Sequence, residues 1–199
     1  MEFEYNKDNI VFNRELSALD KIVLKFVKIL DKEKIDYVII SGYIAILFGR
    51  SRGTEDVDLF IEEMSLEKFT HLWNAIEEEG FECINVFNPK EAYEDFLKDK
   101  TSIRFAEKGK FQPNFELKFP AQDLSVYALE NKIKVILNGE ELNTSRLESQ
   151  IAYKLFLGSE KDLEDAAHLW DVFKNKLDRA LFNKFVTKLK VEDNLKEIE

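Results

Sequence analysis

The fold of this chain is decided by residues 40–61, ISGYIAILFGRSRGTEDVDLFI. The apolar run before Ser41 predicts a buried strand, and Ser41 and Gly42 predict a tight turn into a short helix, where free backbone N–H groups favour an anion. Asp56 and Asp58 stand two apart in the next strand, so both side chains leave one face. Two adjacent carboxylates repel each other unless a cation lies between them, and Mg²⁺ held by carboxylates and substrate phosphates is the usual resolution. The segment therefore predicts a phosphate-binding site beside a metal site.

Composition limits the classes of protein. The 199 residues include 45% hydrophobic residues and 17 Phe, enough for the core of one large domain or two small ones. The net charge of 29 − 39 = −10 opposes a broad nucleic-acid-binding face, although a local basic groove stays open. Cys83 is the only cysteine, which excludes an internal disulfide and a cysteine-based zinc site. The start of the chain, from Met1 to Glu4, does not resemble a signal peptide, and no stretch is long and apolar enough to span a membrane, so we expect a cytoplasmic protein.

Periodicity divides the chain into a mixed region and a helical region. The first region predicts helices and strands in alternation, with a hairpin around Asn138 and Gly139. The expected helices are 15–31, 42–48, 65–79 and 90–98, and the expected strands are 37–41, 57–61, 81–87, 103–105, 115–119 and the hairpin 134–143. After a capping-box pattern at Ser145, three helices are expected, ending near Gly158 and spanning 161–174 and 178–190. The fold class is therefore α+β, a mixed sheet flanked by helices (1–143) followed by a helical lobe (144–199).

These motifs resemble those of the nucleotidyltransferase superfamily, whose founding fold is that of DNA polymerase β. Its pattern is an apolar strand, a Gly-Gly or Gly-Ser turn, about ten residues, then Asp-x-Asp or Asp-x-Glu, with a third carboxylate on a later strand. Glu116 occupies that third position. The segments 151–158, IAYKLFLG, and 161–165, KDLED, are similar to the Lys-Leu and Lys-Asp-x-x-Asp signatures of the abortive-infection branch, which includes toxins of toxin–antitoxin pairs. Ser41 replaces the frequent first glycine, and Glu116 replaces the commoner Asp.

The resemblance implies roles for these residues. Asp56, Asp58 and Glu116 would be catalytic and would hold two Mg²⁺ ions, one on the triphosphate and one lowering the pKa of an attacking hydroxyl. Nucleotide would be bound by five residues: Ser41, Gly42, Arg50, Arg52 and Lys154. The guanidinium fork of arginine suits phosphate oxygens, and a lysine near the apolar stripe of its helix either extends outward to solvent or points into a cleft.

Each residue also has a plain structural alternative. Asp56 and Asp58 can be solvent-facing strand residues above an apolar inner set, and Glu116 can be a surface glutamate. Arg50 and Arg52 can be solvated loop cations, and Asp162 is predicted to be the N-cap of its helix.

Two functions follow. The first is a Mg²⁺-dependent nucleotidyltransferase that moves an NMP from an NTP to a hydroxyl of tRNA, a protein or a small molecule, with a cognate antitoxin as an expected partner if the chain is a toxin. The second is a nucleotide-binding or interaction module on the same scaffold, which Ser41 and Glu116 would support. The sequence does not identify the NTP, the acceptor or the oligomeric state.

Overall fold

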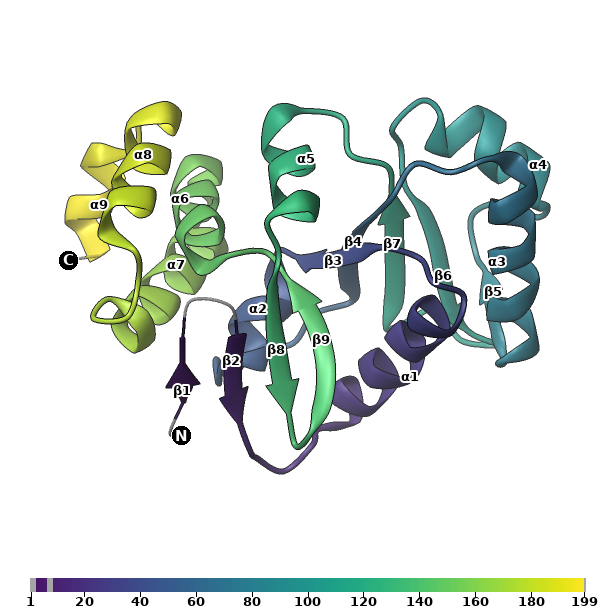
Figure 1. Ribbon diagram of the computed structural model, residues 1–199, viewed down its shortest axis with the longest axis horizontal. Coiled ribbons are helices and arrows are strands. Elements are labelled where there is room, and N and C mark those ends of the chain that lie inside the picture. The colour runs from purple at the N-terminus through teal and green to yellow at the C-terminus, as the bar shows by residue number, and fades with distance from the viewer. Residues whose placement is uncertain (1–2, 7–8, 199) are drawn as a thin grey trace.

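The computed structural model describes residues 3–6 and 9–198, and within them a single sheet of nine strands organises the chain (Figure 1). In spatial order the strands are β1 (Glu4–Tyr5), β2 (Asn9–Phe12), β8 (Ile133–Leu137), β9 (Glu140–Thr144), β3 (Tyr37–Ile40), β4 (Asp56–Ile61), β7 (Asn114–Lys118), β6 (Ile103–Glu107) and β5 (Phe81–Cys83). The helices are α1 (Ala18–Lys32), α2 (Gly42–Leu47), α3 (Leu66–Glu78), α4 (Pro89–Glu91), the π-helical η1 (Ala92–Leu97), α5 (Asp123–Glu130), α6 (Leu147–Leu157), α7 (Glu160–Phe173), α8 (Arg179–Leu189) and α9 (Glu192–Ile198).

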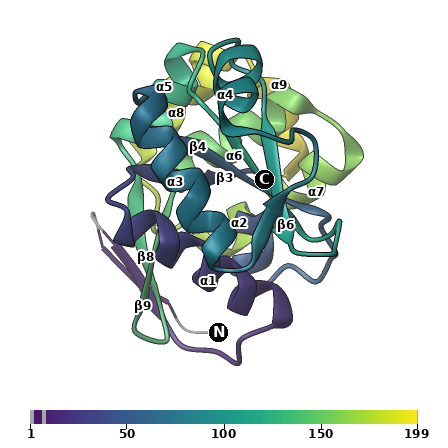
Figure 2. The ribbon, with the colours of Figure 1, turned by 90° about the vertical axis from the view of Figure 1, so that its right-hand side faces the viewer.

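The two faces of the central strands differ in chemistry. Residues alternate along β4 between buried and partly exposed, with Val57 and Leu59 on the buried face. Helices α1 and α3 lie side by side (Figure 2), and α1 contributes Phe26, which stacks on Phe115 of β7 at 4.0 Å between ring centroids. Both rings are fully buried, and each such burial stabilises the fold by about 1.5–3 kcal/mol. The opposite face carries the polar residues of β4 and β7.

Helix α5 covers part of that polar face. Ala128 and Leu129 of α5 pack with Val38 of β3, and Phe60 of β4 lies against this small cluster. Because α5 covers only one end of the face, the strand residues nearer Ser41 are left open to form a site.

The helices α6–α9 gather at one end of the molecule, and α3 and α4 lie at the other (Figure 1). An aromatic cluster joins α7 to the sheet region. Phe173 of α7 contacts Phe48 at 4.9 Å and Phe3 at 5.1 Å between ring centroids, and Phe3 contacts Phe12 of β2 at 5.0 Å. Among residues 3–6 and 9–198, no helix is long and apolar enough to cross a membrane.

Local signals in the sequence account for several element boundaries. Ser65 accepts a hydrogen bond from the Lys68 N–H and begins α3, as predicted. Asn138 and Gly139 take positive φ angles of 52° and 83° in the tight β8–β9 turn, which confirms the predicted hairpin. The expected α+β class, with a terminal group of helices, is confirmed.

One capping prediction is wrong. Helix α6 begins at Leu147, and Ser145 does not cap it. The Ser145 N–H instead donates to the Ile39 carbonyl at 2.9 Å and its hydroxyl donates to Gln150 at 2.9 Å, because this residue continues the path of β9 beside β3.

Candidate functional site

Three carboxylates lie on the polar face of β4 and β7. Asp58 of β4 is the direct register partner of Glu116 of β7, and Asp56 lies two residues before Asp58 on the same face. The predicted common face of Asp56 and Asp58 is therefore confirmed. Burial raises the pKa of Asp58, and the nearby charges of Asp56 and Glu116 raise it further, against the opposing effects of Lys118 and the Ser41 hydroxyl. The site thus concentrates negative charge that a cation would relieve.

The partners of these carboxylates differ. Glu116 forms an ion pair with Arg104 at 2.6 Å and accepts a hydrogen bond from Ser102 at 3.2 Å. Asp56 accepts a hydrogen bond from the Thr54 hydroxyl at 3.2 Å, and Asp58 lies 3.7 Å from the Lys118 ammonium and interacts with the Ser41 hydroxyl. Glu116 is therefore held by a cation of the protein, whereas the two aspartates keep oxygen atoms available.

The donor set fits Mg²⁺ only in part. Mg²⁺ in nucleotide sites is bound by one or two carboxylates together with phosphate oxygens and water, which Asp56 and Asp58 satisfy. Within the described residues no group of three His, Cys, Asp or Glu side chains converges as a metal site. A site made by three protein carboxylates is therefore not preformed here.

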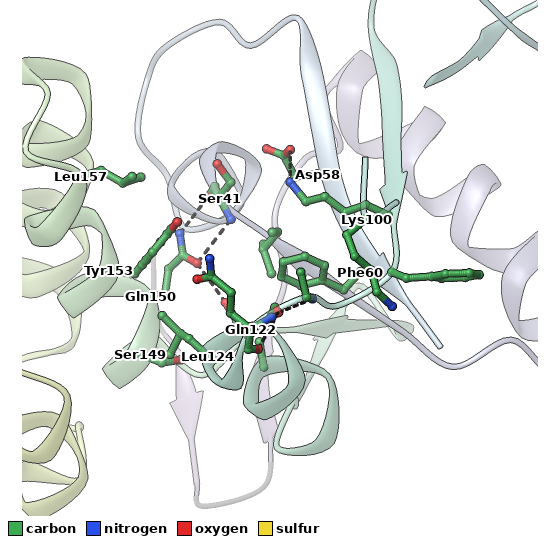
Figure 3. Close-up of a pocket in the computed structure, with 17 residues that line it drawn as sticks. Ser41, Asp58, Phe60, Lys100, Gln122, Leu124, Ser149, Gln150, Tyr153 and Leu157 are labelled. Atoms are coloured by element: carbon green, nitrogen blue, oxygen red, sulfur yellow. Dashed lines mark hydrogen bonds and ion pairs between the residues drawn. The ribbon is translucent and has the colours of Figure 1, made fainter. Parts of the chain in front are cut away.

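The turn between β3 and α2 is strained and held from outside. Ser41 has φ 64° and ψ −136°, a conformation that favours glycine and costs a residue with a side chain about 1–3 kcal/mol. Gln150 of α6 brackets this residue: the Ser41 N–H donates to the Gln150 side chain at 3.3 Å, and the Gln150 amide donates to the Ser41 carbonyl at 3.0 Å (Figure 3). The helical lobe therefore fixes the geometry of the turn.

Gly42 has a steric role. A Cβ atom at this position would lie 2.5 Å from a guanidinium nitrogen of Arg52, which Asp165 holds in place. The absence of a side chain at Gly42 lets Arg52 pack directly against the start of α2.

A pocket of about 420 Å³ opens beside the carboxylates (Figure 3). Ser41 and Asp58 lie at one side, Phe60 is part of the apolar wall, and Tyr153 projects from α6 across the pocket from Phe60. The rest of its lining comes from α5, α6, the ends of β3 and β7 and the loops beside them, together with one residue from the loop between η1 and β6. These residues are Ile40, Lys100, Lys118, Phe119, Ala121, Gln122, Leu124, Ser125, Ala128, Ser145, Ser149, Gln150 and Leu157. The pocket therefore lies between the Ser41 turn and a partly apolar wall.

The three cationic residues that were predicted to bind the nucleotide lie outside this pocket. Arg50, Arg52 and Lys154 converge on the fully buried Asp165 of α7 and do not line the pocket. Arg52 donates to Asp165 through Nε at 2.9 Å and Nη2 at 2.8 Å, and Lys154 Nζ lies 2.7 Å from the same carboxylate. Arg50 pairs with Asp165 and with Glu164. The Lys154 side chain neither extends to solvent nor points into the pocket, the two positions expected for it, because its ammonium is enclosed between α6 and α7.

Asp162 belongs to the same cluster. Its side chain binds Lys154 at 2.9 Å, while Ser159 caps α7, so the predicted N-cap role of Asp162 is wrong. Burial alone would raise the pKa of Asp162, but hydrogen bonds from Ser159 and Lys154 outweigh burial and lower that pKa. The cluster Arg50, Arg52, Lys154, Asp162, Glu164 and Asp165, called the Asp165 cluster below, ties the loop before β4 to the helical lobe.

Sequence reasoning missed four residues near the carboxylates. Lys118 was detectable, because it stands two residues after Glu116 on a strand and must share its face. Arg104 faces Glu116 only through the β6–β7 register, and Lys100 and Gln150 reach the site through tertiary packing. No local pattern marks these last three residues.

Comparison with known proteins gives a consistent fold. No protein-family model matches the sequence, and no curated protein matches it. Among solved structures, an antigenic nucleotidyltransferase-like protein from Paracoccidioides brasiliensis is similar over 92% of this chain and 93% of its own, with 22% identity and a TM-score of 0.55. ANT(2″)-Ia in complex with adenylyl-2″-tobramycin is similar over 86% of this chain and 99% of its own, with 12% identity and a TM-score of 0.56. The solution structure of ANT(2″)-Ia covers 92% and 100%, with 12% identity and a TM-score of 0.53. These matches do not show the abortive-infection branch, and at these identities they show the fold alone: the chain has a nucleotidyltransferase-like fold.

Proposed function

We propose that the chain is a nucleotidyltransferase that moves an NMP from an NTP to a hydroxyl acceptor. The observation that carries this proposal is the placement of Asp58 in the pocket beside the Ser41 turn, with Asp56 two residues earlier on the same face of β4. In the reaction the acceptor oxygen forms a bond to the α-phosphorus, the bond to pyrophosphate breaks, and the hydroxyl proton passes to a base.

Asp56 and Asp58 are the residues that would hold Mg²⁺. Bound there with the phosphates, Mg²⁺ would neutralise charge on the triphosphate and lower the pKa of the attacking hydroxyl. The Ser41 turn orients the phosphates through the free backbone N–H groups of α2, and the pocket positions the substrate. Glu116 would first have to leave Arg104 in order to act as a third ligand or as the base.

Pyrophosphate release tests the proposal. Wild-type protein is incubated with Mg²⁺ and each of the four NTPs, labelled at the α-phosphate, and with a panel of hydroxyl acceptors. We expect pyrophosphate and a labelled acceptor from the wild type, and neither from Asp56→Asn or Asp58→Asn. Wild-type protein that binds none of the NTPs in the presence of Mg²⁺ would refute the proposal.

The acceptor panel has two arms. The family resemblance favours tRNA or a protein side chain, whereas ANT(2″)-Ia has been solved with adenylyl-2″-tobramycin, which makes a small hydroxyl compound the second arm. If the chain acts as a toxin, its expression arrests growth, Asp58→Asn abolishes the arrest, and a cognate antitoxin relieves it.

The pairing of Glu116 with Arg104 favours a second function, a nucleotide-binding or interaction module without turnover. Such a module would bind an NTP in calorimetric titration and release no pyrophosphate with any acceptor. Arg104→Ala separates the two cases, because freeing Glu116 would raise the rate of a slow enzyme and leave a pure binding module inactive.

A further inference from the structure

We propose that Lys118, assisted by Lys100, binds the phosphate groups of the nucleotide, in place of the arginines and the lysine of the Asp165 cluster. This inference rests on the proposed function, since it assigns the cations of the same site. It starts from the pocket, whose lining within the described residues includes two cationic side chains, Lys100 and Lys118.

Lys118 occupies the position next to the carboxylates. It follows Glu116 by two residues on β7, so it lies on the same sheet face, opposite Phe60 of β4. Its ammonium lies 5.4 Å from the centre of the Phe60 ring and 3.7 Å from Asp58. The latter distance exceeds that of an N–H···O hydrogen bond, so the ammonium keeps its donors available for oxygen atoms in the pocket.

Lys100 lies in the loop between η1 and β6 and reaches the same pocket. Its ammonium is 5.5 Å from the centre of the Phe119 ring and pairs with Glu63, a largely exposed carboxylate. An exposed pair of this kind contributes little, about 0–1 kcal/mol, so a phosphate can replace Glu63 at small cost.

The cations of the Asp165 cluster are unsuited to this role. The Lys154 side chain is 2% exposed and contacts Asp162 and Asp165, and Arg52 makes a bidentate contact with Asp165. Recruiting either to a nucleotide would leave the buried Asp165 without part of its countercharge, which is far costlier than exchanging Glu63.

Asp56 and Asp58 would hold Mg²⁺, whereas Lys118 supplies a positive charge that belongs to the protein itself. The aspartates select the cation and Lys118 contributes a point charge that needs no metal. Phosphate binding through Lys118 therefore predicts that part of the affinity persists without Mg²⁺, which separates this contribution from that of Asp56 and Asp58.

The experiment is a calorimetric titration with inorganic tripolyphosphate, which has no base, and with the NTP that binds tightest, both without Mg²⁺ and at fixed low salt. We expect Lys118→Met to weaken both affinities roughly 10- to 100-fold, Lys100→Met to weaken them several-fold, and Lys118→Arg to restore most of the loss. The nucleoside alone should bind all these proteins equally. Lys134→Met is the matched control: it removes the same charge from β8, where Lys134 pairs with Glu141 outside the pocket, and it should change nothing.

The outcomes separate the two proposals. Equal nucleotide affinity of wild type and Lys118→Met overturns this inference and leaves the proposed function standing. A loss in Lys134→Met as large as that in Lys118→Met also overturns it, because the effect would then be a long-range charge effect. Failure of wild-type protein to bind either probe, with or without Mg²⁺, refutes both. Melting temperatures of Lys118→Met and wild type within about 2 °C of each other confirm that the loss is local, since Lys118 is a partly exposed residue.

Discussion

Asp165→Asn should destabilise the protein more than the neutral replacement of any other single charged side chain near the site. The Asp165 carboxylate is fully buried. It accepts hydrogen bonds from Arg52 at 2.8 and 2.9 Å and forms an ion pair with Lys154 at 2.7 Å. The asparagine has nearly the same shape, so packing is preserved while the charge is lost. Removing one member of a buried ion pair typically costs 3–5 kcal/mol, because the remaining charges are left uncompensated.

The lower end of that range applies here. Asp162 still neutralises Lys154, and Glu164 still neutralises Arg50. We therefore expect a loss of about 3 kcal/mol, which for a chain of this size lowers the melting temperature by roughly 6–12 °C. The measurement is thermal unfolding by circular dichroism at pH 7.

Glu164→Gln is the matched control. It makes the same chemical change one residue earlier in α7, where the side chain is 58% exposed, and it should cost under about 1 kcal/mol. An Asp165→Asn protein that melts within about 2 °C of wild type would refute the reasoning, because the buried countercharge would then contribute nothing to folding.

The same residue predicts a pH dependence. Burial by itself raises the pKa of Asp165, but the hydrogen bonds from Arg52 and Lys154 outweigh burial and lower that pKa below its ordinary value. A carboxylate whose folded-state pKa is lowered stabilises the protein above its unfolded pKa of about 3.9 and loses that contribution as the pH falls through the folded-state pKa. The difference in stability between wild type and Asp165→Asn should therefore shrink as the pH is lowered from 7 to about 3.

Three further substitutions test the site. Asp58→Asn should abolish transfer and raise the melting temperature at pH 7, because burial and the neighbouring carboxylates raise the pKa of Asp58 and make its ionised form costly. The rise in melting temperature should vanish near pH 3, where Asp58 is protonated in the folded and the unfolded protein. A rise that persists at pH 3 would contradict the electrostatic cause. Ser41→Gly should be more stable than Ser41→Ala by about 1 kcal/mol in denaturant titration, because only glycine adopts φ 64° and ψ −136° without strain, and the reverse order would show that this turn is relaxed. Gly42→Ala should lower stability by about 1–3 kcal/mol, since the new methyl group meets Arg52, and Gly42→Ala combined with Arg52→Ala should lose less than the sum of the two single changes.

The sequence was most informative where structure is local. Alternation along residues 56–61 predicted which face of β4 carries Asp56 and Asp58, since the period of a strand is independent of its neighbours. The Asn138-Gly139 turn likewise depends on the conformations of two adjacent residues. The family motif placed Glu116 on the strand beside β4, which the parallel register of Asp58 and Glu116 confirms.

Prediction failed where partners come from distant segments. Nothing in the local pattern of Lys154 shows that Asp165 will lie 2.7 Å from its ammonium, so the sequence predicted solvent or a cleft for this side chain and not a buried ion pair. Strands β1 and β2 were missed because they have two and four residues, too few to show a clear alternation. Helix α5 was missed although Leu124, Tyr127 and Ala128 stand at helical spacing, because eight residues make only about two turns, too few for a clear period.

The bracket of Gln150 around Ser41 has a thermodynamic consequence. One side chain of α6 holds both polar groups of the Ser41 backbone, so the docking of α6 on the sheet stabilises the shape of the turn. Any ligand that favours this shape of the turn must, by reciprocity, strengthen the docking of α6 by the same free energy. Ligand binding at the turn and the docking of the C-terminal helices are thus thermodynamically coupled. Binding of such a ligand should increase the protection of the α6 amides from hydrogen exchange, although those amides do not contact the ligand.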